Sequence, residues 1–132
     1  MNRTQSREQA FIFLFESTFG FNTAEEIIDN AKSAREVKIS EFSGKLFSGV
    51  LENIEKIDFY IEENIKHWSK DRLTRTALSV LRLAIFEMMF LKETPKSVVI
   101  NEAVEIAKKY STKEEASYVN GVLGAIANNL DF

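Results

Sequence analysis

The sequence predicts an all-α fold made of a single domain that spans residues 1–132. Apolar residues recur at spacings of three and four along most of the chain, and the alternation typical of strands is absent. Five glycines and one proline leave few places where the chain can be broken. The length of 132 residues and the 45% share of hydrophobic residues suit one domain with its own core.

The first half of the chain is expected to form three helices. Residues 3–19 form the first, and its centre, AFIFLF, is apolar on nearly every side, which predicts deep burial. Gly20 is placed to end this helix, and Asn22 with Glu25 resembles a capping box for a second helix that reaches Ser33. After the connector AREVKIS, one long helix is expected over residues 40–66, because its apolar stripe keeps spacings of three and four.

The second half is expected to hold a short helical turn within HWSKDRL, residues 67–73, and three longer helices. Residues 75–91 are apolar nearly all round, so this helix should be the central element. The pair Thr94-Pro95 breaks the chain, because proline disfavours helix in the residue before it. A helix follows over residues 96–109, and Thr112 with Glu115 predicts a capping box for a last helix that reaches Asn128.

The composition excludes several classes of function. The chain has no cysteine, which excludes disulfides, thiolate metal sites and thiol catalysis. The net charge of −3 does not favour nucleic acid, so any such binding needs a local patch. Arg3 with Arg7, and residues 66–75, are two candidates, although on composition alone a solvated helix face is the simpler explanation of each. There is neither a signal peptide nor an apolar run long enough to cross a membrane, so we expect a cytoplasmic protein.

Enzymatic chemistry is not expected. His67 is the only histidine, and a lone histidine is more often structural than catalytic. The chain carries no HExxH motif, glycine-rich phosphate loop or nucleophile elbow. Glu102 and Glu105 could share a helix face, but no Glu-x-x-His accompanies them. We therefore expect no catalytic residue, no metal and no cofactor.

Polar and small residues interrupt the apolar stripes of the last two helices. Gly121 and Gly124 each cost about 1 kcal/mol against alanine, which predicts that they allow close helix packing. Asn101 lies beside an apolar stripe, where a buried amide needs partners, and Asn120 is expected to hydrogen-bond across the helix contact. Tyr118 and the STKEE turn are left as the polar, exposed part of this segment.

These segments together resemble the NusB family of transcription antitermination factors. The resemblance rests on SREQAFIFLF at residues 6–15, W-x-x-x-RL at 68–73, VLRLAIFE at 80–87, PKSVVINEAVEIAKKY at 95–110 and YVNGVLGAI at 118–126. It implies a fold of about seven helices packed as two small helical bundles, without enzymatic activity. It also implies that the protein pairs with the ribosomal protein NusE, binds boxA RNA of ribosomal operon leaders and acts on the transcription elongation complex.

The resemblance carries over to individual residues. The residues expected to bind RNA are Arg3, Arg7, Phe15, Lys108 and Tyr118. Arginine and lysine would hold phosphates, while Tyr118 would stack on a base. The residues expected to bind NusE are Arg75, Leu78 and Arg82. Thr4 and Gln5 stand where the family often has further arginines, so we expect weak RNA binding alone and stronger binding with the partner.

Other readings of the same residues stay open. Because the first helix has fewer arginines than is common in the family, the chain also suits a helical protein-interaction adaptor, or a self-associating homodimer, without an RNA role. Some RNA cytosine methyltransferases carry a NusB-like leading domain, but no nucleotide-binding fold follows in these 132 residues. Binding of boxA-like and scrambled RNA, with and without NusE, discriminates between these readings.

Overall fold

The computed structural model describes residues 1–65 and 73–130, which contain seven α-helices and no strand. The predicted all-α fold is therefore confirmed. The helices are α1 (Arg3–Ser17), α2 (Ala24–Ser33), α3 (Glu41–Glu52), α4 (Ile54–Asn64), α5 (Arg75–Phe90), α6 (Lys96–Tyr110) and α7 (Lys113–Asn129). The predicted turn within residues 67–73, His67 and most of the basic segment 66–75 lie outside the described residues.

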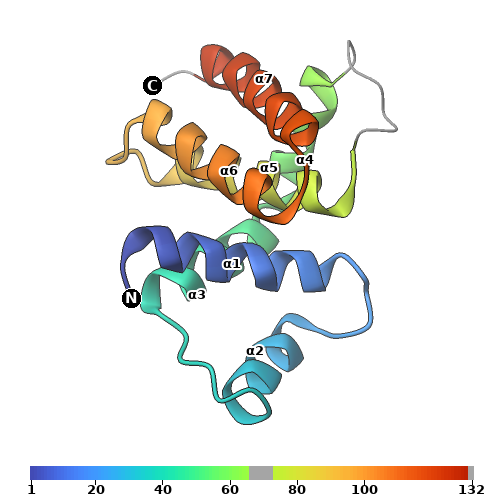
Figure 1. Cartoon of the computed structure of the whole chain (residues 1–132), viewed down its shortest axis with the longest axis vertical. Helices are drawn as coiled ribbons and strands as arrows, with labels where there is room; N and C mark the ends of the chain where they lie inside the picture. Colours follow the sequence, from blue (N-terminus) through green and yellow to red (C-terminus); the bar gives the residue numbers. More distant parts are fainter. Residues whose placement is uncertain (66–72, 131–132) are drawn as a thin grey trace.

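The helices form two groups that meet along α1 and α5. Helices α1, α2 and α3 make the N-terminal group, and α4 to α7 make the C-terminal group (Figure 1). Helix α5 contacts α1, α3, α4, α6 and α7, and most of its side chains are buried. This confirms the central position predicted from its all-round apolar sequence.

The expected long helix over residues 40–66 is wrong, because the chain breaks at Asn53. The side chain of Asn53 donates to the carbonyl of Gly49 at 2.8 Å, and its backbone leaves helical geometry with φ −116° and ψ 19°. An asparagine side chain that binds its own backbone competes with the helix. The break has a structural role, since α3 packs on α1 whereas α4 packs on α5 and α7.

Five of the seven described helices have a side-chain cap at their start, whereas α4 and α6 have none, and two of the caps differ from expectation. The box of α2 is Thr23 with Glu26, one residue later than predicted, which places Ile27 on the buried face. At α7, Thr112 accepts from the backbone of Glu115 at 3.1 Å, as expected. The Glu115 carboxylate, however, accepts from the hydroxyls of Thr74 and Ser111. This carboxylate therefore ties the start of α7 to the start of α5.

Close helix packing occurs at a different glycine from the one expected. A Cβ on Gly124 would meet no atom within 4 Å, so its predicted packing role is wrong. A Cβ on Gly49 would lie 2.2 Å from Cζ of Phe86, which makes Gly49 the site where α3 approaches α5. Gly121 is half-buried, and its packing role stays a prediction. Asn101 and Asn120 are both exposed, so Asn101 is not a buried amide, and the hydrogen bond expected from Asn120 across the helix contact stays a prediction.

Candidate nucleic-acid and partner interfaces

Arg3 lies at the start of α1, beside an open cavity. Asn2 caps the helix with a full capping box, which fixes the backbone from which Arg3 extends. The Arg3 guanidinium lies 3.7 Å from the centre of the Phe42 ring. Arg3 and Lys45 line a cavity of about 710 Å³ together with Glu41, and within the described residues neither cation forms an ion pair. The charge of Arg3 is therefore available to a phosphate.

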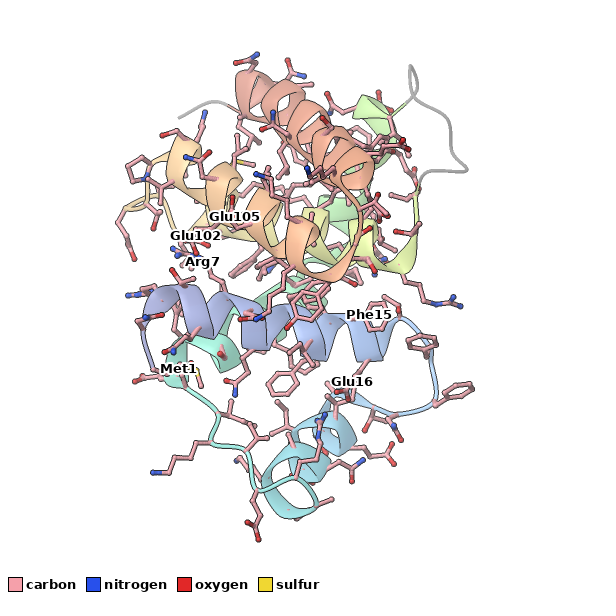
Figure 2. All side chains as sticks on the ribbon, in the orientation of Figure 1. Met1, Arg7, Phe15, Glu16, Glu102 and Glu105 are labelled. Carbon is pink, nitrogen blue, oxygen red and sulfur yellow. The ribbon has the colours of Figure 1, made fainter. Side chains whose placement is uncertain are left out.

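The Arg7 side chain is not accessible to RNA phosphates, which corrects the expectation that it binds RNA. Its side chain is buried between α1, α5 and α6 (Figure 2). Nε and Nη2 donate to the two carboxylate oxygens of Glu87 at 2.7 and 2.6 Å, and Nη1 lies 3.4 Å from Glu102. The hydrogen bonds to Glu87 raise the pKa of Arg7 above its ordinary value despite the opposing effect of burial. Arg7 therefore has a structural role, because its guanidinium is already paired with the carboxylates of Glu87 and Glu102.

Phe15 belongs to a continuous series of rings along α1, the aromatic row. The row consists of Tyr110, Phe11, Phe15, Phe19 and Phe21, with neighbouring ring centres 5.0, 6.1, 5.3 and 6.4 Å apart in that order. Its middle is buried and its two ends are exposed. Phe15 itself is half-buried, and Figure 2 shows it on the side of α1 opposite Glu16. The Phe15 ring packs against Phe19, and its role toward RNA stays a prediction.

Lys108 is exposed near the end of α6, but its charge is partly used. Its Nζ lies 3.4 Å from Glu105, in a pair that is open to water. Such exposed pairs are worth about 0–1 kcal/mol, so Lys108 can exchange Glu105 for a phosphate. The next residue, Lys109, is bound to Glu8 of α1 at 2.5 Å.

Tyr110 and Glu8 join the end of α6 to α1, a contact that the sequence did not reveal. The Tyr110 hydroxyl donates to Glu8 at 2.5 Å. Burial, and then the hydrogen bond to Glu8, raise the pKa of Tyr110 to about 12. Hydrogen bonds from Lys109 and Tyr110 lower the pKa of Glu8. Tyr110 is 40% exposed.

Tyr118 does not form an exposed stacking surface, which is a second correction. Only 1% of the residue is exposed, because it shares the buried face of α7 with Val119 and Val122. A base cannot reach its ring in this structure. The other expected RNA contacts are also spread out, since the 12 residues from Arg3 to Phe15 rise by about 18 Å along α1. The five residues therefore do not form one compact site.

The expected partner residues share one face of α5, as their spacing of three and four requires. Leu78 is half-buried, so a partner can contact it. Arg82 forms two hydrogen bonds to Asp58 of α4, at 2.9 and 2.8 Å. Arg75 is exposed, and its guanidinium lies 4.6 Å from the centre of the Phe19 ring. All three side chains thus have contacts within the protein, since Leu78 packs against the core, and their role toward a partner stays a prediction.

The rest of the described chain offers few other sites. No group of three or more histidine, aspartate or glutamate side chains that could hold a metal is found among the described residues. No described helix is both long and apolar enough to cross a membrane. Phe19, Phe21 and Tyr110 are exposed aromatic residues that sequence reasoning did not select. The sequence signal for Phe19 and Phe21 is that they flank Gly20, which was expected to end the first helix; α1 in fact ends at Ser17, and Gly20 lies in the following loop with φ +74°.

Comparison with known proteins gives one consistent result. The NusB family model matches residues 4–128. The transcription antitermination protein NusB of Clostridium botulinum (strain Loch Maree) is 38% identical over 138 residues, which cover 94% of this chain and 98% of that protein. NusB of Clostridium acetobutylicum is 38% identical, with 98% and 97% covered.

Solved structures agree with these relatives. A structure of the antitermination factors NusB and NusE in complex with double-stranded RNA matches with a TM-score of 0.83 and 31% identity, and covers 98% of this chain and 100% of that chain. The solution structure of NusB from Aquifex aeolicus matches with a TM-score of 0.81 and 32% identity, and covers 96% of this chain and 87% of that chain.

Proposed function

Because the chain belongs to the NusB family, we propose that it binds boxA RNA of ribosomal operon leaders jointly with NusE. The family consists of transcription antitermination factors, which bind RNA and are not enzymes. The finer parts of the proposal are the boxA sequence, the direct contact with NusE, action on the transcription elongation complex and a place in the cytoplasm.

One observation carries the proposal. The whole chain, from end to end, is similar to the NusB subunit of a complex that also contains NusE and double-stranded RNA. The likeness covers both groups of helices, and at 31% identity it extends beyond the fold to the sequence. This supports an RNA partner and a protein partner for the chain.

The charges of the molecule support the proposal that RNA binding needs both partners. The net charge is −3, and the buried pair with Glu87 removes Arg7 from the few cations near the start of α1. Arg3 and Lys45 remain without an ion pair within the described residues. Each phosphate contact adds only about 0.7 to the salt slope for a single strand. We therefore expect weak binding of RNA by the chain alone, and stronger binding when NusE adds its own contacts.

A gel-shift experiment tests the proposal. The chain is mixed with boxA RNA or a scrambled RNA of equal length and composition, each with and without NusE. We expect a clear shift for boxA with NusE, a weak shift for boxA alone, and a weaker shift for the scrambled RNA. If boxA shifts no better than scrambled RNA in the presence of NusE, the proposal fails, and a protein-interaction adaptor or self-associating dimer becomes the better account.

A further inference from the structure

Two phenylalanines lie exposed at the loop that follows α1. Phe21 is 85% exposed and Phe19 is 41% exposed. Their rings are stacked, with an angle of 15° between the planes and 6.4 Å between the centres. Single exposed apolar side chains are common, but adjacent ones that form a patch often mark a binding surface.

A cation from another helix lies against this pair. The Arg75 guanidinium is 4.6 Å from the centre of the Phe19 ring, which is within the distance for a cation–π contact. The Thr74 hydroxyl accepts a hydrogen bond from the backbone of Ala77 at 3.1 Å, so the start of α5 is capped and Arg75 is held beside α1. Within the described residues Arg75 forms no ion pair, which leaves its charge for an anion.

The Phe19 ring, on which Phe21 stacks, is supported by the core. Phe19 packs edge-on against Phe15 at 5.3 Å, and Phe15 packs on Phe11, which is 2% exposed. The Phe19 ring is therefore fixed by the core before any ligand arrives. A platform that is already ordered loses less conformational entropy on binding.

We propose that Phe19, Phe21 and Arg75, the stacking platform, receive unpaired bases of the bound RNA strand. The inference rests on the proposed function, and it names where that RNA is held. Single-stranded nucleic acid is bound by aromatic rings on which bases stack, next to cations that hold the backbone. The platform supplies both, with Arg75 placed to contact the phosphate beside a stacked base. It takes the role that the buried Tyr118 cannot perform, and it moves Arg75 from the partner surface to the RNA surface.

The test compares two exposed phenylalanines. Phe21→Ala removes the outer ring of the platform. Because Phe21 is highly exposed, the substitution should change the free energy of unfolding little. The matched control is Phe59→Ala, because Phe59 is 57% exposed on α4 and is not part of the platform. The dissociation constant for boxA RNA is measured at saturating NusE and several salt concentrations, and NusE binding is measured separately without RNA.

We expect Phe21→Ala to weaken RNA binding by roughly 5- to 150-fold, the range for loss of one base–aromatic stack, with an unchanged salt slope. Arg75→Gln should instead reduce the salt slope by about 0.7, the loss of one phosphate contact. Photocrosslinking of bromouridine-substituted RNA to a peptide that contains Phe21 would support the contact directly. Phe59→Ala should leave RNA affinity within about twofold of the unaltered chain.

Three results would overturn the inference in distinguishable ways. If the unaltered chain binds boxA and Phe21→Ala binds it equally well, the platform is not an RNA site, while the proposed function stands. If Phe21→Ala weakens NusE binding without RNA, the platform belongs to the protein partner. If the unaltered chain does not bind boxA with NusE, the proposed function fails and this inference fails with it.

Discussion

Replacement of Arg7 by methionine tests whether this residue is structural. Methionine keeps an unbranched stem as long as that of arginine up to Nε but lacks the guanidinium, so it leaves the Glu87 carboxylate without the two hydrogen bonds of 2.7 and 2.6 Å. Glu87 is 1% exposed, so water cannot replace those bonds. Removal of one partner from a buried ion pair costs about 3–5 kcal/mol, because the other charge stays buried without compensation. We therefore expect Arg7→Met to lower the free energy of unfolding by that amount.

The measurement is a double-mutant cycle followed by urea denaturation. Arg7→Met, Glu87→Leu and the double variant are compared with the unaltered chain. The double variant should be clearly more stable than the sum of the two single changes predicts, because it removes both charges together. In a separate RNA-binding titration at several salt concentrations, Arg7→Met should leave the salt slope unchanged, whereas Arg3→Gln should reduce it by about 0.7. A loss below about 1 kcal/mol for Arg7→Met, together with a reduced salt slope, would refute the structural role.

Three further predictions concern packing, pH and the partner. Gly49→Ala should be less stable than Gly44→Ala by about 1–3 kcal/mol in urea denaturation. The reason is that a Cβ at Gly49 meets the Phe86 ring at 2.2 Å, while one at Gly44 meets no atom within 4 Å. Equal stabilities would contradict the close packing of Gly49 against Phe86. The pKa of Tyr110 is raised to about 12, so its contribution to the free energy of unfolding is complete below pH 10 and is lost as the pH rises toward 12. Tyr110→Phe should remove this loss of stability at alkaline pH, which denaturation at several pH values can check. Leu78→Asp should weaken NusE binding in calorimetry while the melting temperature stays near that of the unaltered chain, and unchanged affinity would exclude Leu78 from the interface.

Local patterns along the sequence were enough to predict most of the fold. The central position of α5 followed from its apolar residues on every side, and the start of α7 followed from its cap, Thr112. The break at Asn53 could not be predicted in this way, because the apolar stripe continues through it at the same spacing. The break depends on which helix each half packs against, and that is a property of the tertiary structure.

The candidate site was harder to predict, because exposure and charge pairing depend on distant residues. Arg7 resembles a phosphate ligand in the sequence, but Glu87 is 80 residues away and takes its charge. Tyr118 follows a polar turn, but its position on α7 directs it into the core. Phe21 could not be predicted as part of a site, because nothing in the sequence shows that Arg75 lies beside Phe19, on which Phe21 stacks.

Joint recognition of boxA RNA and NusE is the central claim, and calorimetry in both orders tests it most directly. NusE affinity is measured with and without boxA RNA, and RNA affinity is measured with and without NusE. Because coupling between two ligands is reciprocal, each must change the affinity of the other by the same factor. We predict an increase of about 5-fold or more in both directions for boxA, and a smaller increase for the scrambled RNA. A factor of one for boxA in both orders would contradict joint recognition.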